Sequence, residues 1–297
     1  MTLRLENLVL ATGDNYSCGA SGPGKLTGRV WSWTPDKAGA YKLTLRAGDK
    51  RINTVVHVAP AQPSKGVTRK CLFLGDSITE KGGYTGRLLG IAESDGLKLT
   101  LLGSRGKAPN LTEGRSGWRA QFYTGYRSYN GVPNRFYNPS GKRFDFKYYM
   151  KGMKYDSVDR VCIALGTNDV FAFKNDKELN AEIKRVLKRI DTMVKSIRTY
   201  DKTIKIGLFI TVPPTGKPET FLHNYADRQT LARFKRNLFL YTGALIEKYK
   251  DQEENGVWLV PVNTSIDEQF IDGVHPFGKG YDQIAEVVWC WLKNLEE

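Results

Sequence analysis

The chain has 297 residues, of which 40% are hydrophobic and 26% charged, and its formal net charge at pH 7 is +14. This composition excludes a disordered or fibrous protein, and the length allows one large domain or two unequal ones. No apolar run approaches the ~20 residues of a membrane-spanning helix, so the sequence predicts no membrane span.

The N-terminus shows no secretory signal pattern, because Arg4 and Glu6 interrupt the apolar stretch that such a peptide needs. We expect a protein made without an export signal or one whose leader has been removed. The second case fits an extracellular or cell-envelope setting. The four cysteines are widely spaced and form no CxxC pair, so we expect no metal site.

Residues 1–66 predict a small all-β domain ahead of the remainder of the chain. Two alternating stretches, 42–46 and 52–58, flank a Gly-Asp turn and are typical of a β-hairpin. The stretch resembles the last strands of an immunoglobulin-like module. Residues 59–66 are rich in Pro and Ala and indicate a linker. The domain either binds a glycan or braces the rest of the protein, and we favour bracing.

Residues 67–297 alternate buried strands with amphipathic helices. Apolar residues spaced by three or four positions over 179–197 predict the clearest helix, and further helices are expected near 225–250 and after Pro276. This order predicts a doubly wound, three-layer α/β/α domain of flavodoxin-like type with a five-stranded parallel sheet. The five expected strands are 71–74, 99–102, 161–165, 204–210 and 257–260.

The first expected strand ends in Gly75-Asp76-Ser77. A serine between a strand and a helix places its hydroxyl at the edge of the sheet where binding sites form, and helix N–H groups there favour a developing anion. The alternative interpretation is a simple turn that caps the next helix. The third strand ends in Gly166-Thr167-Asn168-Asp169, whose Asn side chain either points at the same place or forms an Asx turn.

The last strand is followed by Asp272-Gly273-Val274-His275-Pro276. An acid three residues before a histidine can orient the imidazole, which can then accept a proton from a serine. The alternative is a surface loop with an incidental histidine. The other two histidines, His57 and His223, are expected to be structural.

These blocks, taken together in this order, resemble the SGNH (GDSL) hydrolase family over residues 68–297. The resemblance implies that Ser77 is the nucleophile, that His275 is the general base and later the acid, and that Asp272 orients His275. It also implies an oxyanion hole made by the N–H of Ser77, the N–H of Gly114 and the side-chain amide of Asn168. Gly117 is a less favoured second-block donor. Asp76 and Asp169 are expected to form local hydrogen bonds.

The Gly114-Arg115-Ser116 block is similar to the Gly-Arg-Ser of acetylesterases that act on plant pectin. It precedes an aromatic and basic stretch, 118–155, which we expect over the active-site edge. Aromatic faces stack on sugars and cations pair with acidic groups, although such residues can equally form a satellite core. The predicted substrate-binding residues are Arg115, Trp118, Tyr123 and Tyr126.

The sequence therefore predicts a serine esterase that removes small acyl groups, with acetyl favoured, from an acylated carbohydrate. It needs no metal or organic cofactor. A lipase or thioesterase of the same family is the enzymatic alternative. A non-catalytic module that binds an anionic polymer, including nucleic acid, is the alternative from another class; we expect no nucleic-acid partner. The oligomeric state is left open.

Overall fold

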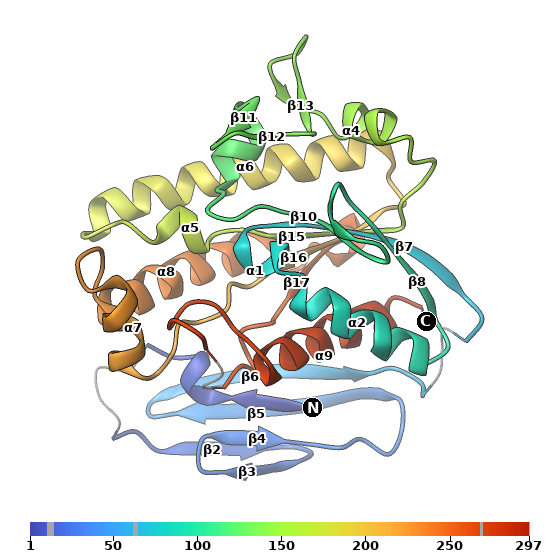
Figure 1. Cartoon of the computed structure of the whole chain (residues 1–297). Coiled ribbons are helices and arrows are strands. Elements are labelled where there is room, and N and C mark those ends of the chain that lie inside the picture. The colour runs from blue at the N-terminus through green and yellow to red at the C-terminus, as the bar shows by residue number, and fades with distance from the viewer. Residues whose placement is uncertain (11–14, 62–64, 268–269, 297) are drawn as a thin grey trace.

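The computed structural model describes residues 1–10, 15–61, 65–267 and 270–296. Its N-terminal part consists of two three-stranded antiparallel sheets, which lie at the bottom of Figure 1. One has the order β1-β4-β3, formed by Thr2–Arg4, Val30–Ser32 and Lys25–Thr27. The other has the order β2-β5-β6, formed by Cys18–Ser21, Gly39–Ala47 and Lys50–Val58.

The predicted hairpin is confirmed, because Ala47 pairs with Lys50 next to the turn and the register continues to the pair Gly39–Val58. A small buried cluster from both sheets includes Leu5, Trp31 and Leu43. The immunoglobulin-like character of this part and its boundary at residue 66 stay predictions. The expected linker, 59–66, lies partly outside the described residues.

The central sheet contains all five predicted strands, each parallel to its neighbours. These strands are β7 (Thr68–Gly75), β8 (Lys98–Leu102), β15 (Arg160–Ala164), β16 (Lys205–Phe209) and β17 (Val257–Val260). The predicted count of five is corrected to seven, since β10 (Asn110–Gly114) pairs with β7 and β9 (Arg105–Lys107) pairs with β10. Arg105–Lys107 has no apolar run, which is why the sequence pattern does not reveal it.

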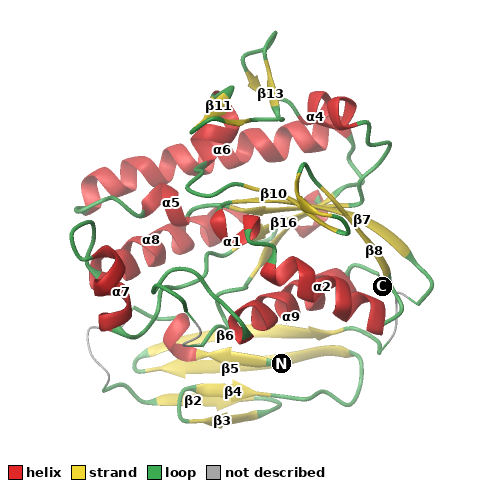
Figure 2. Ribbon diagram, viewed as in Figure 1, coloured by secondary structure: helices red, strands yellow, loops and turns green. Residues whose placement is uncertain are grey.

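Helices cover both faces of this sheet (Figures 1 and 2). α2 (Gly83–Ser94) and α9 (Lys279–Asn294) pack against Cys71 and Phe73 of β7. α6 (Asp176–Tyr200) and α8 (Leu231–Tyr249) pack against Leu72 and Leu74 of the same strand. Burial on both sides explains the continuous apolar runs of the strands. In the part of the chain that the structure describes, every helix is too short or too polar to cross a membrane.

The aromatic and basic stretch 118–155 does not lie over the site edge for most of its length. α3 (Ala120–Gly125) and α4 (Phe146–Met153) pack along α6, and Figure 1 shows the stretch extending beyond α6 at the top of the molecule. Two short hairpins, β11–β12 and β13–β14, span Ser128–Tyr129, Val132–Pro133, Tyr137–Asn138 and Arg143–Phe144. Phe136 and Tyr149 stack with ring centroids 4.1 Å apart, and both are fully buried. The satellite core is therefore the better interpretation.

The N-terminal part contacts the loop between β17 and α9. The backbone N–H of Arg4 donates to the carbonyl of Thr264 at 2.7 Å. The Asn7 side chain, at the end of the short 3₁₀ helix η1 (Leu5–Asn7), donates to the carbonyls of Asn263 and Ile266 at 2.9 and 2.7 Å. These contacts join the N-terminal sheets to the loop that continues to Asp272–His275.

Candidate active site

Ser77 begins a single helical turn at the carboxyl end of β7. The turn, α1 (Ser77–Glu80), is capped by Asp76, whose Oδ1 accepts the N–H of Ile78 at 3.0 Å. Burial raises the pKa of Asp76 to about 6. Gly75 is required just before it, because a Cβ there would lie 2.2 Å from Oγ1 of Thr79. The serine hydroxyl is thus held at the edge of the sheet by a rigid strand and a tight turn.

The structure brings Ser77, His275 and Asp272 together in one hydrogen-bonded row. Ser77 Oγ lies 2.8 Å from His275 Nε2, and His275 Nδ1 lies 2.7 Å from Asp272 Oδ2. The other carboxylate oxygen, Oδ1, accepts the backbone N–H groups of Val274 and His275 at 3.0 and 2.9 Å. Burial works to raise the pKa of Asp272, but the hydrogen bonds from the His275 ring and from these N–H groups outweigh it and hold that pKa below the usual range.

A residue that the sequence analysis missed completes the surroundings of Asp272. Tyr225 ends α7 (Pro218–Tyr225), and its hydroxyl donates to Asp272 Oδ2 at 2.9 Å. No sequence signal marks it, because the two residues lie 47 positions apart. The other two histidines, His57 and His223, are exposed on β6 and α7.

Asn168 lies in α5 (Thr167–Val170), at the carboxyl end of β15 next to β7. Its amide donates to the carbonyl of Trp118 at 3.2 Å, which leaves one N–H of the same group for another acceptor. Asp169 is buried and accepts the N–H of Ala120 at 2.9 Å, which joins α5 to the start of α3. Burial raises the pKa of Asp169 to about 7.

The role of Gly114 as an oxyanion donor stays a prediction, and one contact argues against it. Its N–H already donates to Thr112 Oγ1 at 3.2 Å, and the residue is buried against α1. A Cβ on Gly114 would lie 2.2 Å from the nitrogen of Glu80, so close backbone packing explains the glycine.

Gly117 offers a second backbone N–H on the same loop. It is exposed and has a φ of +73°, and its N–H makes no hydrogen bond to any residue that the structure describes. The residues before and after Gly117 form hydrogen bonds to α1 and to Asn168. Ser116 donates to the Glu80 carboxylate of α1 through both its backbone N–H and its hydroxyl, and the Trp118 carbonyl accepts from Asn168.

Three of the four predicted substrate contacts are corrected by their burial. Trp118 and Arg115 are each 1% exposed and Tyr123 is fully buried. The guanidinium of Arg115 pairs with Glu113 and lies over the rings of Trp118 and Tyr123. These side chains support the loop from inside and do not reach solvent. Tyr126, at the end of α3, is 46% exposed, so its predicted contact with the substrate stays a prediction.

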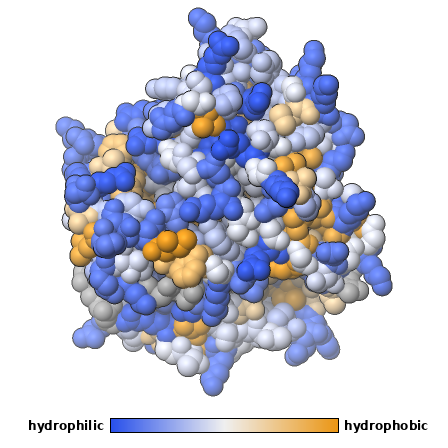
Figure 3. Space-filling model, in the orientation of Figure 1, coloured by the Kyte–Doolittle hydropathy of each residue, from blue (hydrophilic) through white to orange (hydrophobic). Residues whose placement is uncertain are grey.

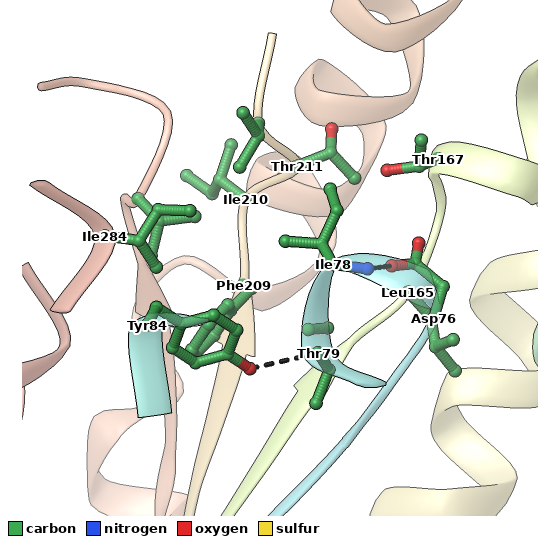
Figure 4. Close-up of a pocket in the computed structure, with 13 residues that line it drawn as sticks. Asp76, Ile78, Thr79, Tyr84, Leu165, Thr167, Phe209, Ile210, Thr211 and Ile284 are labelled. Carbon is green, nitrogen blue, oxygen red and sulfur yellow. Dashed lines mark hydrogen bonds between the residues drawn. The ribbon is translucent and has the colours of Figure 1, made fainter. Parts of the chain in front are cut away.

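A small apolar pocket lies next to α1, and its lining includes Asp76 and Ile78, the neighbours of Ser77 in the chain (Figure 4). Figure 4 shows the side chain of Ile78 directed toward Ile210 and Thr211. The hydroxyl oxygen of Thr211 is buried and has no hydrogen-bond partner among the described residues. The pocket is lined by residues from α1, α2, α9, the ends of β15 and β16 and the loops that follow β15, β16 and β17: Asp76, Ile78, Thr79, Tyr84, Ala164, Leu165, Thr167, Phe209, Ile210, Thr211, Val212, Val262 and Ile284.

Two apolar side chains beside the Asp272–His275 turn reach the surface. Figure 3 shows one face of the molecule, which is largely hydrophilic with a few separated hydrophobic patches. Ile271 and Phe277, which flank the Asp272–His275 turn in the chain, are 57% and 43% exposed. The N–H of Ile271 donates to the carbonyl of His275 at 2.9 Å, so this apolar side chain belongs to the same loop as the base.

Comparisons with known proteins show similarity to one family and to the folds of several solved structures. A family model described as GDSL-like Lipase/Acylhydrolase matches residues 72–288. A carbohydrate acetylesterase from Sinorhizobium meliloti is 17% identical, with 76% of this chain and 99% of that chain covered and a TM-score of 0.50. An aryl esterase from M. smegmatis is 16% identical, with the same coverages and TM-score. A family 3 carbohydrate esterase from Talaromyces cellulolyticus is 18% identical over 77% of this chain and 98% of that chain, with a TM-score of 0.45. No curated protein matches the chain.

Proposed function

The chain belongs to the GDSL-like lipase/acylhydrolase family and is an ester hydrolase, and on that premise we propose that it is a serine esterase that removes acetyl groups from an acylated carbohydrate. The observation that carries this proposal is the row from Ser77 through His275 to Asp272, with contacts of 2.8 and 2.7 Å. Such a row is the arrangement in which a histidine activates a serine and a carboxylate orients the histidine.

The reaction takes place in two halves. Ser77 Oγ attacks the ester carbonyl while His275 Nε2 takes the hydroxyl proton, and a tetrahedral intermediate forms. His275 then gives the proton to the departing sugar oxygen, and the acyl group stays on Ser77. A water molecule then attacks the acyl carbonyl while His275 takes one of its protons. The bond between the acyl carbon and Ser77 Oγ breaks, His275 returns the proton to that oxygen, and the carboxylic acid leaves.

Three N–H donors stabilise the negative oxygen of the intermediate. We assign them to the backbone of Ser77, the free side-chain N–H of Asn168 and the backbone of Gly117. The unpaired N–H of Gly117 and its position between Ser116 and Trp118 support this choice over Gly114. Donors that are already in place need no reorganisation when charge develops.

The pocket beside Ser77 supports a small acyl group. Its lining includes Ile78, Ile210, Tyr84, Phe209 and Ile284, all of them buried. An apolar methyl group suits such a lining. A long acyl chain needs an extended apolar groove, so the pocket favours an acetylesterase over a lipase.

The carbohydrate half of the substrate is supported by two observations. A protein with the same fold is described as a carbohydrate acetylesterase. Tyr126 presents an exposed ring at the end of α3, and aromatic faces stack on sugar rings.

The first test compares p-nitrophenyl acetate, butyrate and octanoate as substrates, with Ser77→Ala and the surface variant Ser94→Ala in parallel. We expect hydrolysis that falls with chain length, is lost in Ser77→Ala and is unchanged in Ser94→Ala. Release of acetate from acetylated xylan or pectin then tests whether the substrate is an acetylated carbohydrate. Hydrolysis that survives in Ser77→Ala overturns the assignment of Ser77 as the nucleophile. A preference for octanoate overturns the assignment of acetyl as the acyl group.

A further inference from the structure

We propose that Tyr225 is a positioning residue of this esterase, which acts through Asp272 to set the proton affinity and orientation of His275. The inference rests on the proposed function for the roles of Ser77 and His275. It adds a fourth side chain, from a separate helix, behind the row of three.

The geometry places two donors on one carboxylate oxygen. Tyr225 Oη lies 2.9 Å from Asp272 Oδ2, and His275 Nδ1 lies 2.7 Å from the same atom. The second oxygen is occupied by the N–H groups of Val274 and His275. Tyr225 therefore shares the one oxygen on which the imidazole depends.

Packing holds Tyr225 in this position. Its ring lies 5.1 Å from that of Phe221 and 5.5 Å from that of Phe171. Phe221 also packs against Gly273, where φ is +91° and a Cβ would lie 2.9 Å from Cα of Phe221. α7 is thus pressed directly against the turn that carries the acid and the base. The N–H of Thr215, in the loop before α7, donates to the carbonyl of Gly273 at 2.9 Å.

Tyr225 stays a proton donor in this setting. Burial, followed by the neighbouring carboxylate of Asp272, raises the pKa of Tyr225 above its ordinary value. Among the described residues, Arg228 lies over the Tyr225 ring at 5.8 Å, Tyr281 of α9 interacts electrostatically with Asp272, and Asp76, the N-cap of α1, interacts with His275. The neutral phenol therefore withdraws part of the negative charge of Asp272.

Loss of the hydroxyl has two expected effects. Without the phenol, the full negative charge of Asp272 Oδ2 acts on the imidazole and favours its protonated form. The acid limb of the profile of kcat/KM against pH is therefore expected to move upward by about half a pH unit. The phenol also helps to hold Asp272, and through it the imidazole, in line with Ser77, so its loss is expected to lower kcat about tenfold. KM stays within about twofold, because Tyr225 does not touch the substrate.

The experiment measures p-nitrophenyl acetate hydrolysis from pH 5 to 10 for the full chain, Tyr225→Phe and the control Tyr148→Phe, whose ring is exposed on α4. Tyr148→Phe is expected to match the parent. A Tyr225→Phe profile that superimposes on the parent overturns the inference. So does a lower melting temperature with an unmoved acid limb, since that is the result of a purely structural role.

A double-mutant cycle supplies an independent readout. In an Asp272→Asn background, Tyr225→Phe is expected to change kcat by less than about twofold, because the charge that it modulates is gone. Equal effects in both backgrounds overturn the coupling. Failure of the proposed function is distinguishable: the unmodified chain then hydrolyses no ester, or does so without Ser77.

Discussion

The carboxylate of Glu113 lies 2.6 Å from the guanidinium of Arg115, and both side chains are buried directly beneath the loop of the predicted oxyanion hole. Tyr149 and the N–H of Ser104 also donate to Glu113, at 2.9 and 2.7 Å. The pair therefore anchors the loop from the inside, in place of the substrate contact predicted for Arg115.

Glu113→Ala is expected to lower the free energy of unfolding by about 3–5 kcal/mol, because it leaves the charge of Arg115 buried without a partner. Urea denaturation measures this loss. Lys50→Ala, which breaks the exposed pair with Asp49, is the comparison and is expected to leave the free energy of unfolding almost unchanged. Equal losses in the two variants would contradict the role of Glu113.

Asn168→Ala is expected to lower kcat for p-nitrophenyl acetate by about 10²–10³-fold with little change in KM, since the lost N–H acts only on the intermediate. Asn180→Ala, on the exposed face of α6, serves as the control. A rise in KM at constant kcat would mean that Asn168 binds the ground state instead.

Ile210→Ala is expected to enlarge the pocket beside Ser77. The ratio of kcat/KM for acetate to that for butyrate should then fall about tenfold, the scale of one or two methylene groups in an apolar pocket. Ile190→Ala removes the same atoms from the buried face of α6 and is expected to lower stability without changing the ratio. An unchanged ratio for Ile210→Ala argues that the acyl group lies elsewhere.

Asp169 makes stability depend on pH in a predictable direction. Its pKa is raised to about 7 in the folded protein and is about 3.9 in an unfolded chain, so the folded state holds the proton more tightly. The stability that the Asp169 carboxyl contributes is fully present below about pH 4. It is lost as the pH rises toward about 7. Relative to the parent, Asp169→Asn should therefore gain stability between pH 4.5 and 7.5, measured as urea midpoints. Asp227→Asn, at an exposed position, should show no such trend.

Much of the fold could be predicted because its signals are local. The five parallel strands are continuous apolar runs, and the residues that end them, Ser77 and Asn168, follow from the convergence of strand ends at one edge. The structure brings Ser77, Asp272 and His275 into contact, as the motifs suggested.

The remaining features of the site depend on where side chains and N–H groups point, and a sequence does not show this. Whether Gly114 or Gly117 presents a free N–H is decided by one hydrogen bond to Thr112. The aromatic residues after Trp118 look the same in a sequence whether they stack on a sugar or on each other. Tyr225 reaches Asp272 only because α7 packs on Gly273, a contact between distant segments.

The contacts of Arg4 and Asn7 with the loop after β17 join positions that are 256 to 263 residues apart in the chain. During translation, Ser77 and Asn168 leave the ribosome well before the segment that supplies the base. Arg4 and Asn7 are synthesised long before the loop that they contact, and the entropic cost of closing so long a loop grows only slowly with its length. A nascent chain that stops before β17 holds a serine without its histidine. Hydrolysis in a cell-free translation would therefore begin only after the segment with His275 has been made.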